Sequence, residues 1–253
     1  MRLFGDFFKR GLRLDSAQKA YLAMLKAMIL NNVYYHGPHL REGTVWPDHP
    51  ALSMVGEKRL NNVEELTLKC LSDNVPGDFI EAGIWKGGVV ALMAGILKIT
   101  GTTRRKVFGV DSFEGIPPAK PDIYPADAAH VGCENLDILK KNSLEEVTVY
   151  LDQLGLSFPY TQLIKGWFSD ILPGLAATHQ FALVRIDGDT YESTFQALEA
   201  LGPAVSRGGY IIIDDYYSWE GCRKATEDYR ICHNITASLV QIDWTGVYWQ
   251  TSR

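Results

Sequence analysis

Four aspartates stand where two apolar runs of the chain end. Asp187 and Asp189 directly follow one run, and Asp214 and Asp215 directly follow the next. Such runs are typical of buried parallel strands, whose carboxyl ends meet at the sheet edge where open α/β folds bind ligands. Four carboxylates gathered there repel one another unless a cation lies among them, and oxygen ligands favour Mg²⁺. The alternative is that an aspartate caps a helix beginning near Thr190.

A glycine-containing turn follows an earlier strand and opens a helix, the position at which such folds bind a nucleotide. It carries Glu81, Gly83 and Trp85. Trp85 stands where a dinucleotide fingerprint needs its second glycine, so the turn favours a nucleoside without a pyrophosphate. Glu81 is an anion that can accept hydrogen bonds from the amino group of an amino acid moiety. A tight strand-to-helix turn without a ligand is the alternative.

Asp111 ends the following strand, about 30 residues after Glu81. An acidic residue in this position typically accepts hydrogen bonds from both hydroxyls of a ribose. By itself Asp111 is equally compatible with capping its own loop, because aspartate commonly accepts hydrogen bonds from nearby backbone amides. Together with Glu81 it predicts a nucleoside site.

These residues need a scaffold of alternating strands and helices. We expect helices over residues 15–34, 58–71, 89–99, 136–154 with an interruption, 192–201 and 226–232. We expect strands over 78–82, 106–110, 162–165, 181–186 and 210–213, and a hairpin over 238–243 and 247–250. This order predicts a doubly wound, mostly parallel, Rossmann-like α/β sheet with a C-terminal antiparallel hairpin. The stretch from 36 to 50, rich in proline, glycine and histidine, predicts an ordered loop.

Composition excludes several classes of protein. The 253 residues are 46% hydrophobic and 22% charged, which is ordinary for one large domain. The net charge is −5, and the sequence shows no basic stripe of the kind that binds nucleic acid. The four cysteines have no metal-ligand or disulfide-framework spacing, so we expect a cytoplasmic protein. No apolar run is long enough to span a membrane.

The N-terminus carries an amphipathic pattern. Leu3, Phe4, Phe7, Phe8 and Leu12 recur at helical spacing among basic residues. We expect this stripe to pack on the body of the protein or on a second subunit, which predicts a homo-oligomer; a membrane-surface helix is the alternative. His36 and His39 flank Gly37 and Pro38, which favours a turn over a zinc site.

The chain resembles the macrocin O-methyltransferase (TylF-like) family, whose members methylate sugar hydroxyls of natural products with S-adenosylmethionine. Six separated blocks carry the resemblance, at residues 54–62, 79–88, 110–117, 166–173, 185–194 and 208–216. The family implies a class I methyltransferase fold. It also implies an N-terminal helical lid over residues 1–75 and a cofactor-binding core over 76–253.

The resemblance also implies roles for individual residues. Asp187, Asp214 and Asp215 would bind Mg²⁺, and Asp189 would be the general base. The residues implied at S-adenosylmethionine are Met54 and Arg59 on a lid, Glu81, Gly83, Trp85, Asp111, Ser112 and Asp187 at the strand ends, and Trp167, Phe168 and Asp170 near the adenine. The acceptor would be a small glycoside or diol.

The expected reaction is transfer of a methyl group to a hydroxyl that Mg²⁺ makes more acidic and Asp189 deprotonates. Tyr191, Tyr216, Tyr217 and Trp219 adjoin the acids and could form an aromatic wall for a sugar or aglycone. Catechol-type acceptors are an alternative with the same mechanism. An NAD-dependent oxidoreductase and an inert binding protein are alternatives of other classes.

Overall fold

In the computed structural model, which describes residues 12–34, 51–135 and 142–252, one seven-stranded sheet forms the centre of the molecule. Its strands are β1 (Asp78–Ala82), β2 (Val107–Asp111), β3 (Thr161–Lys165), β4 (Phe181–Ile186), β5 (Val205–Ile213), β6 (Val240–Gln241) and β7 (Val247–Gln250). Their order is β3-β2-β1-β4-β5-β7-β6. Strands β1 to β5 are mutually parallel, and β7 is antiparallel to both β5 and β6. The predicted doubly wound sheet with a C-terminal hairpin is confirmed.

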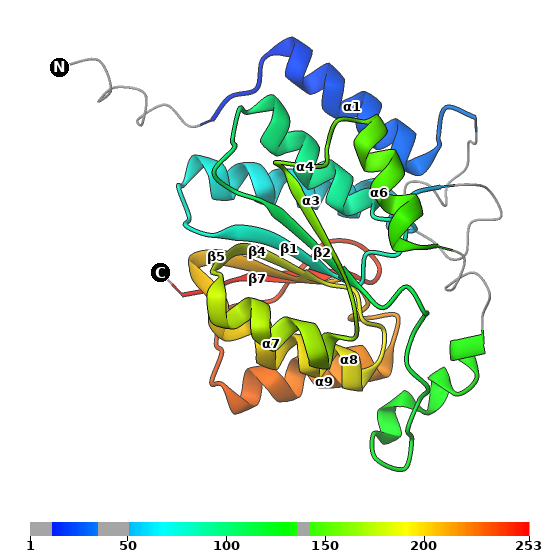
Figure 1. Cartoon of the computed structure of the whole chain (residues 1–253). Coiled ribbons are helices and arrows are strands. Elements are labelled where there is room, and N and C mark those ends of the chain that lie inside the picture. Colours follow the sequence, from blue (N-terminus) through cyan, green and yellow to red (C-terminus); the bar gives the residue numbers. More distant parts are fainter. Residues whose placement is uncertain (1–11, 35–50, 136–141, 253) are drawn as a thin grey trace.

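Helices cover both faces of this sheet (Figure 1). On one face lie α1 (Ser16–Leu30), α3 (Gly56–Ser72), α4 (Gly88–Ile99) and α6 (Leu144–Gln153); on the other lie α7 (Phe168–Thr178), α8 (Tyr191–Leu201) and α9 (Glu220–Cys232). Three short 3₁₀ helices, η2 (Pro125–His130), η3 (Cys133–Asn135) and η4 (Gly202–Ala204), lie in connections. Among the described residues, no helix is both long and apolar enough to cross a membrane.

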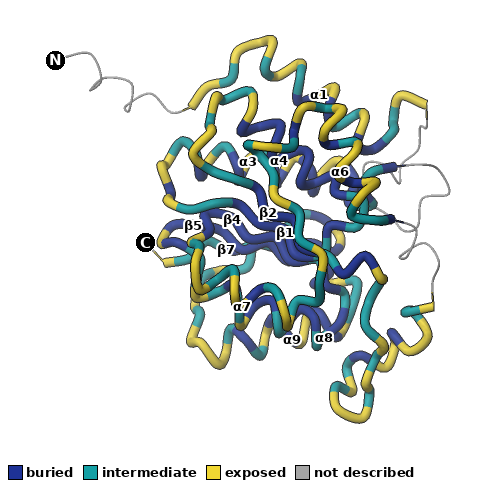
Figure 2. The backbone as a smooth tube through the Cα atoms, viewed as in Figure 1, coloured by how far each residue is buried: buried dark blue, intermediate teal, exposed yellow. Residues whose placement is uncertain are grey.

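The strands are buried from both sides, as Figure 2 shows along the centre of the molecule. Neighbouring residues of one strand enter different cores: Phe79 packs with α1, α3 and α4, whereas Ile80 packs with α7 to α9. All six residues of β4 are buried. Burial on both faces explains why these strands are continuous apolar runs in the sequence.

The N-terminal helices join the same core as the rest of the chain. A capping box between Asp15 and Gln18 begins α1, and Leu25 and Ile29 on this helix pack in the core that contains α4. A Cβ atom at Gly95 of α4 would lie 2.5 Å from Leu25 Cδ2, so the absence of a side chain there permits close helix packing. The domain boundary at residue 75 stays a prediction.

Several elements differ from the sequence expectation. Helix α9 begins at Glu220 rather than at 226, and α1 ends at Leu30 rather than at 34. Helix α7 was not predicted, because Pro173 lies inside it and proline lacks the backbone donor of a regular helix. Strand β5 begins five residues earlier than expected, at Val205, where Gly208 has a φ of 82° and the pairing with β4 shifts register. The amphipathic stripe up to residue 11, the loop at 36–50 with His36 and His39, and residues 136–141 of the expected interrupted helix lie outside the described residues.

Candidate active site

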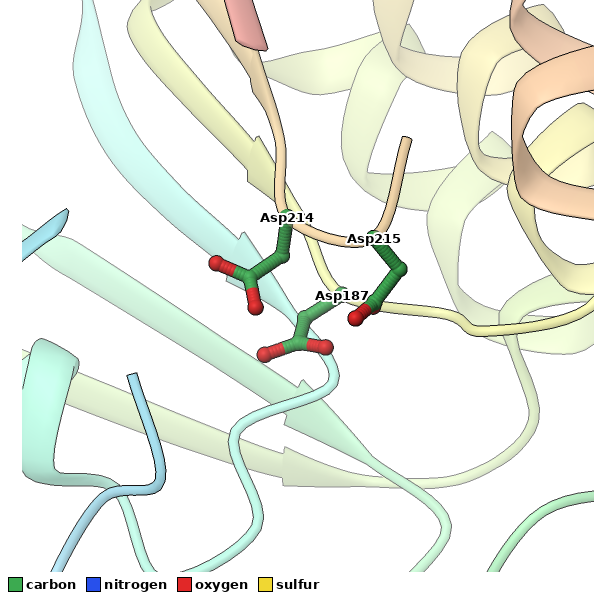
Figure 3. Close-up of side chains that lie close together, drawn as sticks. All are labelled: Asp187, Asp214 and Asp215. Carbon is green, nitrogen blue, oxygen red and sulfur yellow. The ribbon is translucent and has the colours of Figure 1, made fainter. Parts of the chain in front are cut away.

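The predicted acids meet at the carboxyl edge of the sheet, where the ladder continues one residue beyond the strands. The backbone N–H of Asp187 donates to Ala82 O at 2.9 Å, and that of Asp214 donates to Ile186 O at 3.0 Å. Figure 3 shows the side chains of Asp187, Asp214 and Asp215 pointing toward one another. One carboxylate oxygen from each lies within 4.8 Å of the others. The geometry thus brings the predicted acids together.

Two buried arginines hold this cluster in place. Arg185, the penultimate residue of β4, is 1% exposed and forms ion pairs with Glu81, Asp214 and Asp187, the last at 3.0 Å. Arg59 of α3 forms ion pairs with Asp214 and, at 3.0 Å, with Asp243. Asp214 is therefore bonded through both of its oxygens. Sequence reasoning missed Arg185, although a lone arginine within a buried apolar strand is a signal that could have identified it.

The acids differ in how readily they ionise. Burial favours the neutral form of Asp214, but Arg185 and Arg59 outweigh it and lower its pKa. Burial and the neighbouring carboxylates raise the pKa of Asp187 and Asp215. Burial, followed by the charges of Asp187 and Asp214, raises the pKa of Asp189 to about 7. With all four acids ionised, the cluster would carry more negative charge than the two arginines compensate, which is why three of the four pKa values are raised.

The donor set fits a hard divalent cation. All three candidate ligands are carboxylates, and Asp215 Oδ2 is buried without a hydrogen-bond partner among the described residues. A Mg²⁺ ion bound about 2.0–2.1 Å from each oxygen needs its ligands roughly 3–4 Å apart, and the three oxygens here lie within 4.8 Å of one another. Each oxygen of Asp214 keeps a second lone pair after bonding to an arginine. Asp187, Asp214 and Asp215 would hold such an ion.

The turn after β1 is shaped by residues with left-handed backbone conformation. Gly83 has a φ of 89°, and a Cβ atom there would lie 1.9 Å from Asp187 O, so only glycine fits. Trp85 has a φ of 47°, which is uncommon for a residue with a side chain. Asp111 Oδ2 accepts hydrogen bonds from the N–H groups of Ile84 and Trp85, each at 2.9 Å. Asp111 therefore fixes the conformation of the turn after β1.

Asp111 also caps its own loop, as the alternative interpretation expected. Its Oδ1 accepts a hydrogen bond from Phe113 N at 2.8 Å. Ligand binding is compatible with capping only through Oδ1, which keeps one lone pair beside the cavity, because the N–H groups of Ile84 and Trp85 take both lone pairs of Oδ2.

Two cavities of about 420 and 410 Å³ open at this edge of the sheet. The first is lined mainly by residues that follow β1, β2, β3 and β4, including Gly83, Trp85, Asp111, Ser112, Gly166, Trp167, Phe168 and Gly188. The second is lined by residues from more distant segments, including Ser53, Arg59, Glu81, His130, Asp214, Asp215, Tyr217, Trp219, Trp244 and Thr245. Both share Met54, Trp85, Ile116, Asp187 and Asp189.

Most of the predicted site residues line one or both of these cavities. The first cavity receives Met54, Gly83, Trp85, Asp111, Ser112, Trp167, Phe168, Asp187 and Asp189. Arg59 and Glu81 line only the second cavity, and Asp170 is exposed on the first turn of α7, outside both linings. Of the four aromatic residues expected to form a wall, Tyr217 and Trp219 line the second cavity. Tyr191 and Tyr216 instead bond to Asp228 and Glu227 of α9.

The sheet order and the paired cavities at its carboxyl edge define a class I methyltransferase. The chain belongs to the macrocin-O-methyltransferase (TylF) family, whose sequence model matches residues 21–251. It is an O-methyltransferase that uses S-adenosylmethionine. This assignment replaces the alternatives of an NAD-dependent oxidoreductase and an inert binding protein.

Individual relatives agree with this assignment. The chain is 39% identical, over 93% of its length and 94% of the relative's, to the 8-demethyl-8-(2,3-dimethoxy-alpha-L-rhamnosyl)-tetracenomycin-C 4'-O-methyltransferase of Streptomyces olivaceus. It is 39% identical, over 84% of its length and 80% of the relative's, to the demethyldecarbamoylnovobiocin O-methyltransferase of Streptomyces niveus. The structure of the O-methyltransferase NovP superposes with a TM-score of 0.88 at 37% identity, covering 93% of this chain and all of that one.

Proposed function

We propose that the protein is a Mg²⁺-dependent O-methyltransferase that methylates a sugar hydroxyl of a glycosylated natural product. The observation that carries this proposal is the position of the acidic cluster between two cavities, one suited to the cofactor and one to the acceptor. Asp187 and Asp189 line both cavities, at the boundary where a methyl group must cross. The relatives support the sugar, since one is named for a substrate that carries a rhamnosyl group.

The first cavity suits S-adenosylmethionine, whose sulfonium makes its methyl group transferable. Asp111 is assigned to a ribose hydroxyl through the free lone pair of its Oδ1, and Ser112, Trp167 and Phe168 to the adenine end of the cavity. Glu81, which lines the second cavity beside the residues that the two cavities share, is assigned to the amino group of the methionine moiety, because its Oε2 is buried without a partner among the described residues. Trp85 and Met54 lie on the boundary with the second cavity. Asp170 is the assignment that the geometry supports least, because it is exposed.

Asp189 is assigned as the general base. Its pKa of about 7 suits a group that must accept a proton near neutral pH. Its φ of 55° is unusual for a residue with a side chain, and backbone strain of this kind is found preferentially at functional sites. A bound Mg²⁺ would supply the positive charge that lowers the pKa of a coordinated hydroxyl. Asp189 would then take that proton while the cavity walls hold the oxygen in line with the methyl group.

The second cavity offers aromatic surfaces for the acceptor. Trp219, Tyr217 and Trp244 line it, and the last two are 52% and 44% exposed, so they form the rim. An aromatic rim around an acidic floor suits a molecule with an apolar aglycone and a polar sugar. A catechol remains the second candidate, because its two adjacent hydroxyls can bind a metal in the same way.

The test has three measurements on the purified protein. Calorimetric titration with S-adenosylmethionine should show binding, and methyl transfer to 4-nitrophenyl α-L-rhamnoside should require Mg²⁺ and stop with EDTA. Transfer to catechol under the same conditions should be slower. Transfer that persists in EDTA would contradict the metal assignment, and a preference for catechol would replace the sugar by the second candidate.

A further inference from the structure

A histidine in the wall of the second cavity has no hydrogen-bond partner within the part of the chain that the structure describes. His130 is 1% exposed and lines this cavity, yet neither Nδ1 nor Nε2 has a partner among the described residues. Buried polar side chains are nearly always bonded, because an unsatisfied group loses its interactions with water and gains nothing in return. A histidine that only filled space would be expected to bond through at least one ring nitrogen. His130 therefore holds, beside the cavity, two buried ring nitrogens that no described residue bonds.

The segment that carries His130 is fastened to the body of the protein. Asp127, three residues earlier on η2, accepts hydrogen bonds from Tyr191 N at 2.6 Å and Glu192 N at 3.3 Å. These amides begin α8, directly after Asp189 and Thr190. The ring of Tyr124 also stacks on that of Tyr191, with centroids 5.4 Å apart. The position of His130 is thus tied to the helix that follows the proposed base.

A second contact ties His130 to the acidic cluster. Its ring packs against Trp219 with centroids 4.1 Å apart. The backbone N–H of Trp219 donates to Asp215 O at 3.1 Å, and Trp219 lines the second cavity together with Asp189. The imidazole therefore has a fixed place beside the cavity in which the reacting hydroxyl must lie.

We propose that His130 is an acceptor-binding residue that hydrogen-bonds a sugar hydroxyl neighbouring the one that is methylated. This inference rests on the proposed function and adds a residue that selects the acceptor. A neutral imidazole offers one donor and one acceptor, which matches a hydroxyl or an adjacent pair of hydroxyls. Burial, opposed by Asp127, lowers the pKa of His130, which keeps the ring neutral. A site that bonds a particular hydroxyl discriminates strongly against analogues that lack it.

The experiment uses the full-length enzyme, S-adenosylmethionine, Mg²⁺ and 4-nitrophenyl α-L-rhamnoside with its 2-, 3- and 4-deoxy analogues. His130→Phe keeps the ring against Trp219 but removes both nitrogens, and His130→Gln restores a donor and an acceptor. We expect His130→Phe to raise the KM for the rhamnoside roughly five- to fifty-fold, with a smaller change in kcat. Wild type should disfavour one deoxy analogue that His130→Phe accepts as readily as the parent glycoside. His130→Gln should recover part of the discrimination.

Two controls separate a binding role from a structural one. His233→Phe replaces an exposed histidine at the end of α9, outside both cavity linings, and should leave KM unchanged. Calorimetric affinity for S-adenosylmethionine and the melting temperature should be the same in His130→Phe and wild type. A fall in cofactor affinity together with acceptor affinity would overturn the proposal, and so would a loss of folding in both His130 variants.

The remaining outcomes distinguish this inference from the proposed function. If His130→Phe keeps the wild-type KM and discrimination among the deoxy analogues, His130 does not bind the acceptor, and the sugar assignment stands. If wild type methylates catechol but none of the glycosides, the sugar assignment fails and this inference fails with it.

Discussion

The two cavities have nearly equal volume but different origins. The first is made by loops that directly follow the parallel strands, and its residues come from positions that any doubly wound sheet places at its carboxyl edge. The second draws on the segment before α3, the insertion between β2 and α6, and the turn between β6 and β7. The first cavity is therefore mainly a property of the sheet, and the second adds residues of the connections to the acids at the sheet edge. Under the proposed function, substitutions in the first cavity should mainly change cofactor binding, and substitutions in the second should mainly change acceptor binding.

The largest effect is expected where the two cavities meet. Asp189→Asn removes the proposed base but keeps its size and its place in both linings. We expect kcat to fall about 10²- to 10⁴-fold, the usual contribution of general base catalysis, with unchanged affinity for S-adenosylmethionine. Single-turnover methyl transfer and calorimetry measure the two quantities. Wild-type turnover in the variant would remove Asp189 from the base role.

The next largest effect is expected at the buried ion pairs that hold the acidic cluster beneath the second cavity. Arg185→Met leaves Glu81 and Asp214 without their shared buried cation, so we expect a loss of about 3–5 kcal/mol in the free energy of unfolding. Urea denaturation measures it. Lys69→Met, which breaks an exposed ion pair with Asp73, is the control and should change little. Equal stability of the two variants would show that Arg185 is not needed to hold the cluster.

A smaller effect is expected on the affinity for the acceptor, without a change in the affinity for the cofactor. A Cβ atom at Gly221 would lie 2.1 Å from Asp127 Oδ1 and 2.8 Å from Tyr191 N, so Gly221→Ala pushes against the contact that fastens η2. We expect a loss of about 1–3 kcal/mol in stability and a raised acceptor KM, with cofactor affinity retained. Gly174→Ala in α7 is the control, because a Cβ there meets nothing within 4 Å. Loss of cofactor affinity in Gly221→Ala would argue against separable cavities.

The smallest effect concerns pH. Burial, opposed by Arg185, raises the pKa of Glu81 to about 8, above its value in the unfolded chain. Between the two pKa values the folded state holds a proton that the unfolded state has released, so this contribution to stability decreases as pH rises from about 5 to 8. Urea denaturation in EDTA should show a shallower decrease for Glu81→Gln than for wild type. An identical slope would mean that Glu81 is ionised in the folded protein throughout this range.

The sequence predicted the strands and the residues at their carboxyl ends better than it predicted the connections between them. Apolar runs and the residues that end them locate strands, so Asp111, Asp187 and Asp214 could be assigned to one sheet edge from their positions in the chain. The pairing of Arg59 with Asp243 joins residues 184 positions apart, and no local pattern encodes it. His130 lies in an insertion without hydrophobic periodicity, where neither its burial nor its lack of partners could be inferred.

The way in which Asp127 fastens the insertion has a consequence for how such an enzyme can diversify. Its carboxylate binds backbone amides of α8, which every residue type except proline provides, so the attachment does not depend on the side chains of the helix. The neighbouring positions on the insertion are then free to change while the anchor is kept. If this carboxylate is retained, the residues of the insertion that line the second cavity can change without disturbing the acids at the sheet edge. This segment is therefore the natural place at which to engineer a new acceptor preference.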